Sequence, residues 1–190
     1  MLPKDVLENY SPAPSQTKQA QALITLLQQC DAGGVVVTVF GGYGLDALYG
    51  KLTRDHCDFD LVVEPSTRPH LERVLVSQGY THISVWSEPG RKEVYTHPDF
   101  AEPFAAEVAT FDRTMIPHLA RQYGIPLADT ALFPEIPNGR LFDYPIRTPT
   151  LEGVAIINRI QQQTGVSRGW AEFAHQEHQA LLLAVLHKRR

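Results

Sequence analysis

The chain has 190 residues, 43% of them apolar, with a formal net charge of −4 and a pI near 6.0. This length and composition suit one hydrophobic core that needs no disulfide framework, and Cys30 and Cys57 are interpreted as reduced thiols. The mild acidity supplies no basic excess for a nucleic-acid backbone, so no nucleic-acid partner is expected. We find neither a signal-peptide pattern nor an apolar run long enough to cross a bilayer, so the sequence predicts a soluble, cytoplasmic protein.

The first part of the chain alternates predicted helices and strands. Helices are expected over Ser15–Gln29, Tyr43–Tyr49 and Pro69–Gln78. Ser15 is expected to cap the first of these helices. Strands are expected over Val35–Phe40, Asp58–Val63, Tyr80–Trp86, Arg91–Thr96 and Phe104–Phe111. The third and fourth of these strands are expected to form an antiparallel pair.

The amino-acid composition changes after Asp112, where prolines become frequent. A strand is expected over Arg140–Arg147, a helix capped by Thr150 that runs to about Gln163, and a long helix over Trp170–His187. The sequence therefore predicts a β-rich unit at residues 1–112 and a mostly helical region at residues 113–190.

Two aspartates begin the strand Asp58–Val63. Alternate residues of a strand share a face, so Asp58 and Asp60 present adjacent carboxylates while Phe59 and Leu61 face the core. Adjacent like charges are costly without a cation, and Mg²⁺ favours one or two carboxylates together with phosphates and water. The pair predicts a magnesium site that orients a triphosphate; the alternative is a solvent-exposed sheet edge with two surface aspartates.

A glycine pair, Gly41-Gly42, ends the preceding predicted strand in a tight turn before the next helix. Backbone without Cβ atoms can approach a phosphate closely, and the first amides of a helix point towards an anion. Arg54, in the loop before Asp58, could bind a phosphate through its guanidinium, or form a surface ion pair with Asp55 or Asp58.

Glu107 is the one acid inside the predicted apolar strand Phe104–Phe111. Burying a lone carboxylate without a partner is expensive, so a position beside Asp58 and Asp60 is expected. There Glu107 could share the metal, take a proton from an attacking hydroxyl as general base, or do both.

Together these features resemble the DNA polymerase β-like nucleotidyltransferase superfamily. The closer similarity is to the branch of aminoglycoside 2″-nucleotidyltransferases and lincosamide nucleotidyltransferases, which attach AMP or another nucleotide to an antibiotic hydroxyl. The residues that carry it are Gly41, Gly42, Asp46, Gly50, Thr53, Arg54, His56, Asp58 and Asp60. Tyr43 stands where this branch commonly has tryptophan.

The resemblance implies an α+β (α/β-like) nucleotidyltransferase fold: a mixed β-sheet flanked by helices, with a small helical C-terminal region that completes the cleft. It implies that Asp58, Asp60 and Glu107 bind Mg²⁺, with Glu107 as candidate base, and that Gly41, Gly42 and Arg54 face the nucleotide. The expected reaction transfers a nucleotidyl group, AMP from ATP, to a hydroxyl of a small-molecule acceptor and releases pyrophosphate. Aminoglycoside- and lincosamide-like compounds are the candidate acceptors.

Two other functions stay open: a nucleotide-binding or antitoxin-like partner module that retains the fold, and transfer to a protein hydroxyl. Asp46 is expected to be structural, bonding Thr53 or Arg54, and His56 is interpreted as a loop histidine that could instead brace the aspartates. His175 and His178 are read as surface or acceptor-pocket groups. Tyr95, His97, Asp99 and Glu102 either line an acceptor pocket or form a polar connection. Neither the acceptor nor the oligomeric state follows from the sequence.

Overall fold

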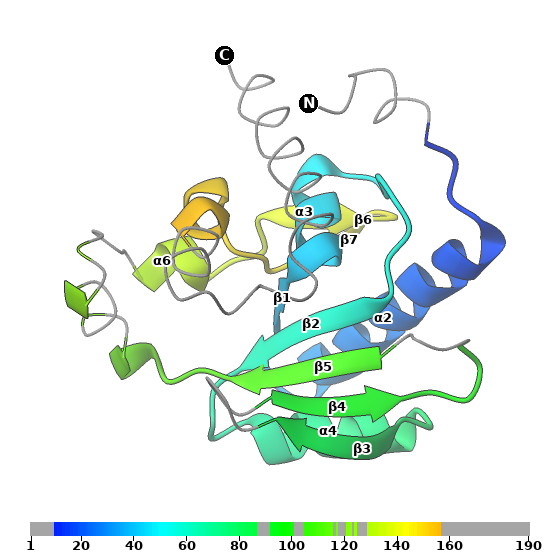
Figure 1. The fold of residues 1–190 in the computed structure, drawn as a ribbon, viewed down its shortest axis with the longest axis horizontal. Coiled ribbons are helices and arrows are strands. Elements are labelled where there is room, and N and C mark those ends of the chain that lie inside the picture. The colour runs from blue at the N-terminus through cyan, green and yellow to red at the C-terminus, as the bar shows by residue number, and fades with distance from the viewer. Residues whose placement is uncertain are drawn as a thin grey trace.

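A five-stranded mixed sheet forms the centre of the fold in the computed structural model, which describes residues 10–86, 92–100, 105–115, 117, 121–122, 124 and 129–156 (Figure 1). Its strands are β1 Thr38–Phe40, β2 Asp58–Val63, β3 Thr81–Trp86, β4 Lys92–Thr96 and β5 Ala105–Thr110. They lie in the order β1-β2-β5-β4-β3. The β2–β5 pair is parallel and the other pairs are antiparallel, including the predicted β3–β4 pair. The acidic positions therefore fall on the two neighbouring strands β2 and β5.

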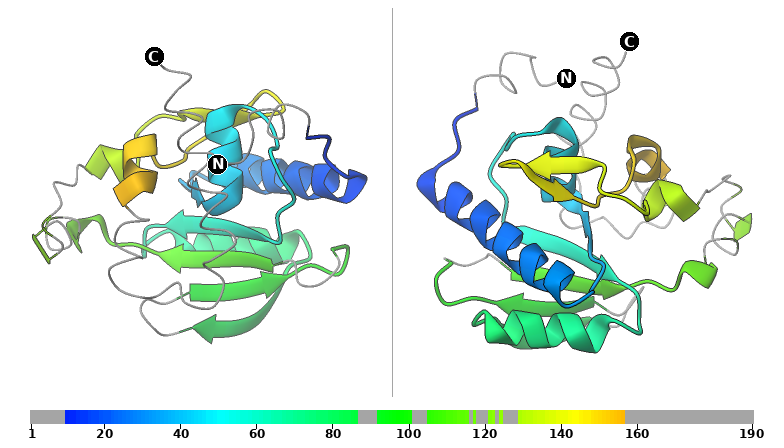
Figure 2. Two further views of the ribbon diagram at one scale, coloured as in Figure 1. Left: turned by 45° about the horizontal axis from the view of Figure 1, so that its top comes forward. Right: turned by 180° about the vertical axis from the view of Figure 1, so that it is seen from behind.

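Two helices cover one face of this sheet, α2 (Pro14–Ala32) and α4 (Arg68–Ser77), as seen from behind in Figure 2. Residues of β2 alternate between half-buried and buried, and the buried set includes Phe59 and Leu61 at 0% exposure. These two side chains join Leu23 of α2 and Leu71 of α4 in the main core, as predicted from the strand alternation. Asp58 and Asp60 consequently lie on the opposite face.

The third helix of the N-terminal part, α3 (Gly41–Tyr49), starts directly after β1 and ends at Gly50, which has a left-handed φ of 87°. The expected tight turn at Gly41-Gly42 is thus the first turn of this helix. The prediction of Ser15 as a helix cap is wrong, because α2 already begins at Pro14 with Ala13 at the cap position. A proline fits the first helical position, since its missing amide would have no partner there.

A β-hairpin replaces the single strand predicted over Arg140–Arg147. Its strands are β6 (Gly139–Leu141) and β7 (Tyr144–Ile146). Phe142 and Asp143 between them have φ of 44° and 66°, the positive values that tight hairpin turns require. Leu141 and Ile146 belong to the main core, and Gly139 lies against the backbone of Ala47 in α3. The hairpin therefore completes the core beside α3.

The remaining elements after β5 are short: a 3₁₀ turn at Arg113–Met115 and α6 at Asp129–Leu132. The hydroxyl of Thr150 accepts the amide of Gly153 at 3.1 Å, so Thr150 caps a helix as predicted. This helix is described for residues 151–156; its expected extension to Gln163 and the predicted helix Trp170–His187 lie outside the described residues. Among the described helices, we find none of the length and apolarity needed to span a membrane.

Candidate active site

Three carboxylates meet on the face of the sheet opposite α2 and α4. The parallel register of β2 and β5 places Asp60 directly beside Glu107, and Asp58 lies on the same face two residues before Asp60. One oxygen from each of the three carboxylates lies within 4.8 Å of the others, and all three residues are half-buried. Such an all-oxygen set has the donor chemistry that Mg²⁺ prefers. The structure thus brings together the three acids that the sequence singled out.

The glycine pair lies at the edge of this cluster. β1 pairs with β2 so that Phe40 is opposite Asp60, and the chain enters α3 at the next residue. Gly41 has a φ of 61°, and a Cβ there would lie 2.0 Å from Asp60 Oδ2. Only glycine leaves room for that carboxylate. The first backbone amides of α3 have no acceptor within the helix. They lie close enough to the acids to bind a phosphate that the acids hold through a cation.

A buried pair, Asp46 and His56, lies behind the glycine turn. His56 Nε2 is 2.6 Å from Asp46 Oδ2, and both side chains are 1% exposed. Asp46 also accepts the Thr53 hydroxyl, which confirms its predicted structural role. The Gln16 side chain bonds both the amide and the carbonyl of His56, at 2.9 and 3.0 Å. The interpretation of His56 as a plain loop residue is therefore wrong: its ring is fixed in the interior.

The imidazole of His56 fills the space next to Gly42. A Cβ on Gly42 would lie 2.2 Å from His56 Nδ1 and 3.0 Å from Arg54 Nη2. The His56 ring also stacks near Tyr43, with ring centroids 4.4 Å apart. Because His56 stands two residues before Asp58, this contact fixes the start of β2 relative to the first turn of α3.

Replacing Asp46 by alanine should lower the free energy of unfolding by about 1–3 kcal/mol, because His56 and Thr53 would each lose a buried partner. The same change at Asp99, whose ion pair with Lys18 is more than half exposed, should alter it by less than about 1 kcal/mol. Urea unfolding of both variants measures the difference. Equal stabilities would show that the buried pair does not hold this region.

Arg54 places a cation beside the amino end of α3. Its Nη1 donates to the backbone carbonyl of Asp55 at 3.0 Å, and its Nη2 lies beside Gly42. The residue is half-buried, and a guanidinium in this position can pair with an anion bound at the glycine turn. The carboxylate of Asp55 accepts the hydroxyl of Tyr10.

Three of the four residues that could line an acceptor pocket or form a polar connection are described, namely Tyr95 at the end of β4 and His97 and Asp99 after it. Tyr95 is 1% exposed and is paired with Ala106, so it lies on the core face, away from the acids. There it donates to Glu93, whose buried carboxylate also binds Arg68. His97 contacts the carbonyl of Gln78, and Asp99 pairs with Lys18, as a polar connection would. Glu102, His175 and His178 lie outside the described residues.

Comparisons with known proteins agree with this geometry. Residues 22–102 match the family described as aminoglycoside-2″-adenylyltransferase. The solution structure of the antibiotic-resistance factor ANT(2″)-Ia is similar, with a TM-score of 0.68 at 20% identity over 90% of this chain and 85% of that one. This chain has a nucleotidyltransferase fold. The predicted resemblance to aminoglycoside 2″-nucleotidyltransferases and the predicted α+β class are confirmed.

Two further structures share this nucleotidyltransferase fold. The crystal structure of ANT(2″)-Ia in complex with adenylyl-2″-tobramycin has a TM-score of 0.58 at 18% identity, over 91% of this chain and 99% of that one. An antigenic nucleotidyltransferase-like protein from Paracoccidioides brasiliensis has a TM-score of 0.51 at 14% identity, over 87% and 73%. No curated protein sequence matches. At these identities the structural likeness establishes the fold.

Proposed function

We propose that the protein is a Mg²⁺-dependent nucleotidyltransferase of the EC 2.7.7 type that transfers AMP from ATP to a hydroxyl of a small-molecule acceptor. The observation that carries this proposal is the group of three carboxylates on adjacent strands, beside a helix that begins with glycine. The family match over residues 22–102 and the ANT(2″)-Ia structure that holds an adenylylated tobramycin support it. Aminoglycoside- and lincosamide-like compounds are the first acceptors to test.

Each residue of the site has a defined part in the proposed reaction. Asp58, Asp60 and Glu107 would hold Mg²⁺, which supplies positive charge to the phosphates. The amides at Gly41 and Gly42 and the guanidinium of Arg54 bind the phosphate oxygens. Glu107 accepts the proton of the acceptor hydroxyl, whose oxygen attacks the α-phosphorus as pyrophosphate leaves in line.

The double variant Asp58→Asn/Asp60→Asn should bind Mg²⁺-ATP at least tenfold more weakly than the wild type, because both carboxylates of β2 are lost. Isothermal titration calorimetry measures the affinity. The matched control replaces two exposed aspartates, Asp31→Asn/Asp99→Asn, and should bind as the wild type does. If the site variant bound Mg²⁺-ATP as tightly as the wild type, the proposal would be contradicted. It would also be contradicted if the wild type bound the nucleotide but released no pyrophosphate with any acceptor.

A further inference from the structure

His56 lies where the proposed phosphate site meets the interior of the protein. A Cβ on Gly42 would lie 2.2 Å from His56 Nδ1 and 3.0 Å from Arg54 Nη2. The edge of the imidazole and the end of the guanidinium therefore lie against the same side of Gly42, in the first turn of α3. The first amides of a helix have no acceptor within it and are free to bind an anion. The position of the His56 ring thus limits where Gly42 and Arg54 can lie.

The backbone and the ring of His56 are held by different contacts. Nε2 lies 2.6 Å from Asp46 Oδ2, and because a carboxylate accepts hydrogen bonds, Nε2 is the donor. The other ring nitrogen, Nδ1, is the one that faces Gly42. The side chain of Gln16, in α2, bonds the amide and the carbonyl of His56 at 2.9 and 3.0 Å. Neither the ring nor its backbone can shift without breaking a buried hydrogen bond.

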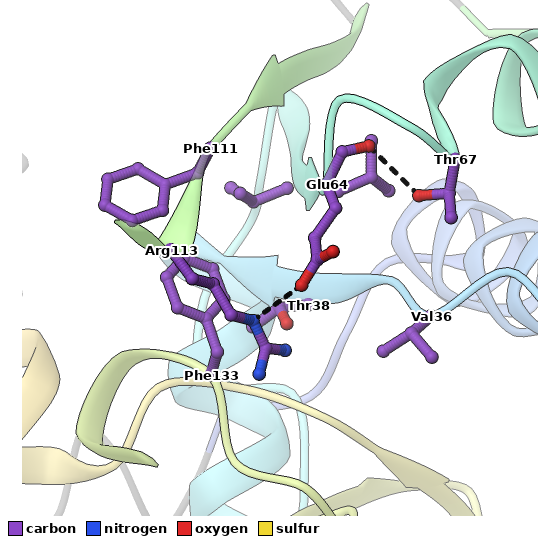
Figure 3. Close-up of a pocket in the computed structure, with 9 residues that line it drawn as sticks. Val36, Thr38, Glu64, Thr67, Phe111, Arg113 and Phe133 are labelled. Carbon is purple, nitrogen blue, oxygen red and sulfur yellow. Dashed lines mark hydrogen bonds and ion pairs between the residues drawn. The ribbon is translucent and has the colours of Figure 1, made fainter. Parts of the chain in front are cut away.

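Arg113, also near the acidic face of the sheet, is engaged elsewhere. Its Nε pairs with Glu64 Oε1 at 2.9 Å, and its guanidinium lies 5.2 Å from the ring of Phe133 (Figure 3). These groups line a pocket together with Thr38, the first residue of β1, whereas the glycine turn follows the last residue of that strand. The cation beside the glycine turn is therefore Arg54, whose placement depends on His56.

We propose that His56 is a positioning residue for the triphosphate. Its ring sets the first turn of α3 and the guanidinium of Arg54 at the spacing at which both bind the phosphates. With a side chain that is 1% exposed, it acts through these two groups and does not touch the nucleotide. The proposal rests on the proposed function, because it takes the glycine turn as the phosphate site.

The variant His56→Gln tests this role. Its side-chain amide can still donate to Asp46, but the space beside Gly42 is no longer filled by a ring. Calorimetry should show Mg²⁺-ATP binding at least about tenfold weaker than in the wild type, the scale of one hydrogen bond to a charged group. The matched control is Thr53→Val, which removes another buried hydrogen bond to Asp46 and leaves the ring in place. It should lower the stability to urea but bind Mg²⁺-ATP as the wild type does.

A double-mutant cycle gives a signature that a merely structural role would not produce. Gly42→Ala alone should also weaken Mg²⁺-ATP binding, because its Cβ would lie 2.2 and 2.4 Å from two atoms of the His56 ring. In Gly42→Ala/His56→Gln the methyl group takes up space that the ring has left. The double variant should therefore bind no more weakly than the weaker single variant, although independent effects would multiply. Gly50→Ala/His56→Gln is the control, since a Cβ on Gly50 meets no atom within 4 Å, and it should show the full loss of His56→Gln.

A second pair of variants tests the support that His56 receives from α2. Gln16 and Gln19 are each 7% exposed, but Gln16 bonds the backbone of His56, whereas Oε1 of Gln19 has no hydrogen-bond partner among the described residues. Gln16→Leu should weaken Mg²⁺-ATP binding, and Gln19→Leu should leave it unchanged. This comparison keeps the role testable if His56→Gln does not fold.

The outcomes separate the positioning role from the proposed function. Wild-type affinity in His56→Gln overturns the role, as do an equal loss of affinity in Thr53→Val and independent losses in the cycle with Gly42→Ala. Equal affinities of the Gln16 and Gln19 variants also overturn it. Failure of the wild type to bind Mg²⁺-ATP would instead overturn the proposed function, and that measurement needs no variant.

Discussion

Replacing Glu107 by glutamine is expected to lower kcat for pyrophosphate release by about 10²–10⁴-fold, the range typical of a lost general base. Glutamine keeps the size of the side chain and an oxygen beside Asp60, but it cannot take up the proton of the acceptor hydroxyl. Nucleotide affinity should fall much less than kcat, since Asp58 and Asp60 remain. Steady-state kinetics together with calorimetry separates the two effects.

The control for this variant is Glu72→Gln, the same chemical change on α4, whose side chain is 41% exposed and lies on the other side of the sheet. It should retain kcat within about twofold, as expected for a surface substitution. A Glu107→Gln protein with kcat within tenfold of the wild type would exclude Glu107 as the base. Loss confined to nucleotide affinity would limit Glu107 to metal binding.

The second large effect is expected from Gly41→Ala, which should lower kcat/KM by at least about 10²-fold, the scale of a displacement of about 1 Å at a reacting centre. The new Cβ would lie 2.0 Å from Asp60 Oδ2 and 2.9 Å from its Cγ. Because the aspartate side chain is short, its carboxylate must leave its position beside Glu107. Kinetics and Mg²⁺-nucleotide titration measure the loss.

Gly50→Ala is the matched control, because Gly50 also has a left-handed backbone but no atom within 4 Å of a new Cβ. Both variants should lose roughly 1–2 kcal/mol of stability from the strained φ. Only Gly41→Ala should lose activity. Similar activities of the two proteins would show that the contact between Gly41 and Asp60 does not position the acids.

The acidic part of the site could be predicted because each of its signals is local. Asp58–Val63 shows the alternation of a half-buried strand, and its observed bounds are those predicted. Glu107 is the one acid in an apolar strand, and because burying a lone carboxylate is costly, a partner was expected for it. The parallel register of β2 and β5 places Asp60 beside it. The roles of these acids in catalysis remain predictions, as does the division of the chain at residues 112 and 113.

Other features depend on contacts between distant segments, which periodicity does not reveal. His56 looks like any loop residue until Asp46 and Gln16 are placed around it. The hairpin turn at Phe142-Asp143 has no glycine, so the continuous pattern from Arg140 to Arg147 resembled one strand. The contact between Phe133 and Phe111 likewise joins segments that are distant in the sequence.

The insertion of β5 between β2 and β4 has a consequence for how the protein folds. β3 and β4 are neighbours in sequence and can pair early, but β5 must join β2 across a long intervening segment. Glu107 therefore meets Asp58 and Asp60 only when β5 pairs with β2, so their mutual repulsion arises in that long-range step. We expect the barrier of that step to respond to divalent cations, which makes assembly of the sheet and assembly of the acidic cluster a single event.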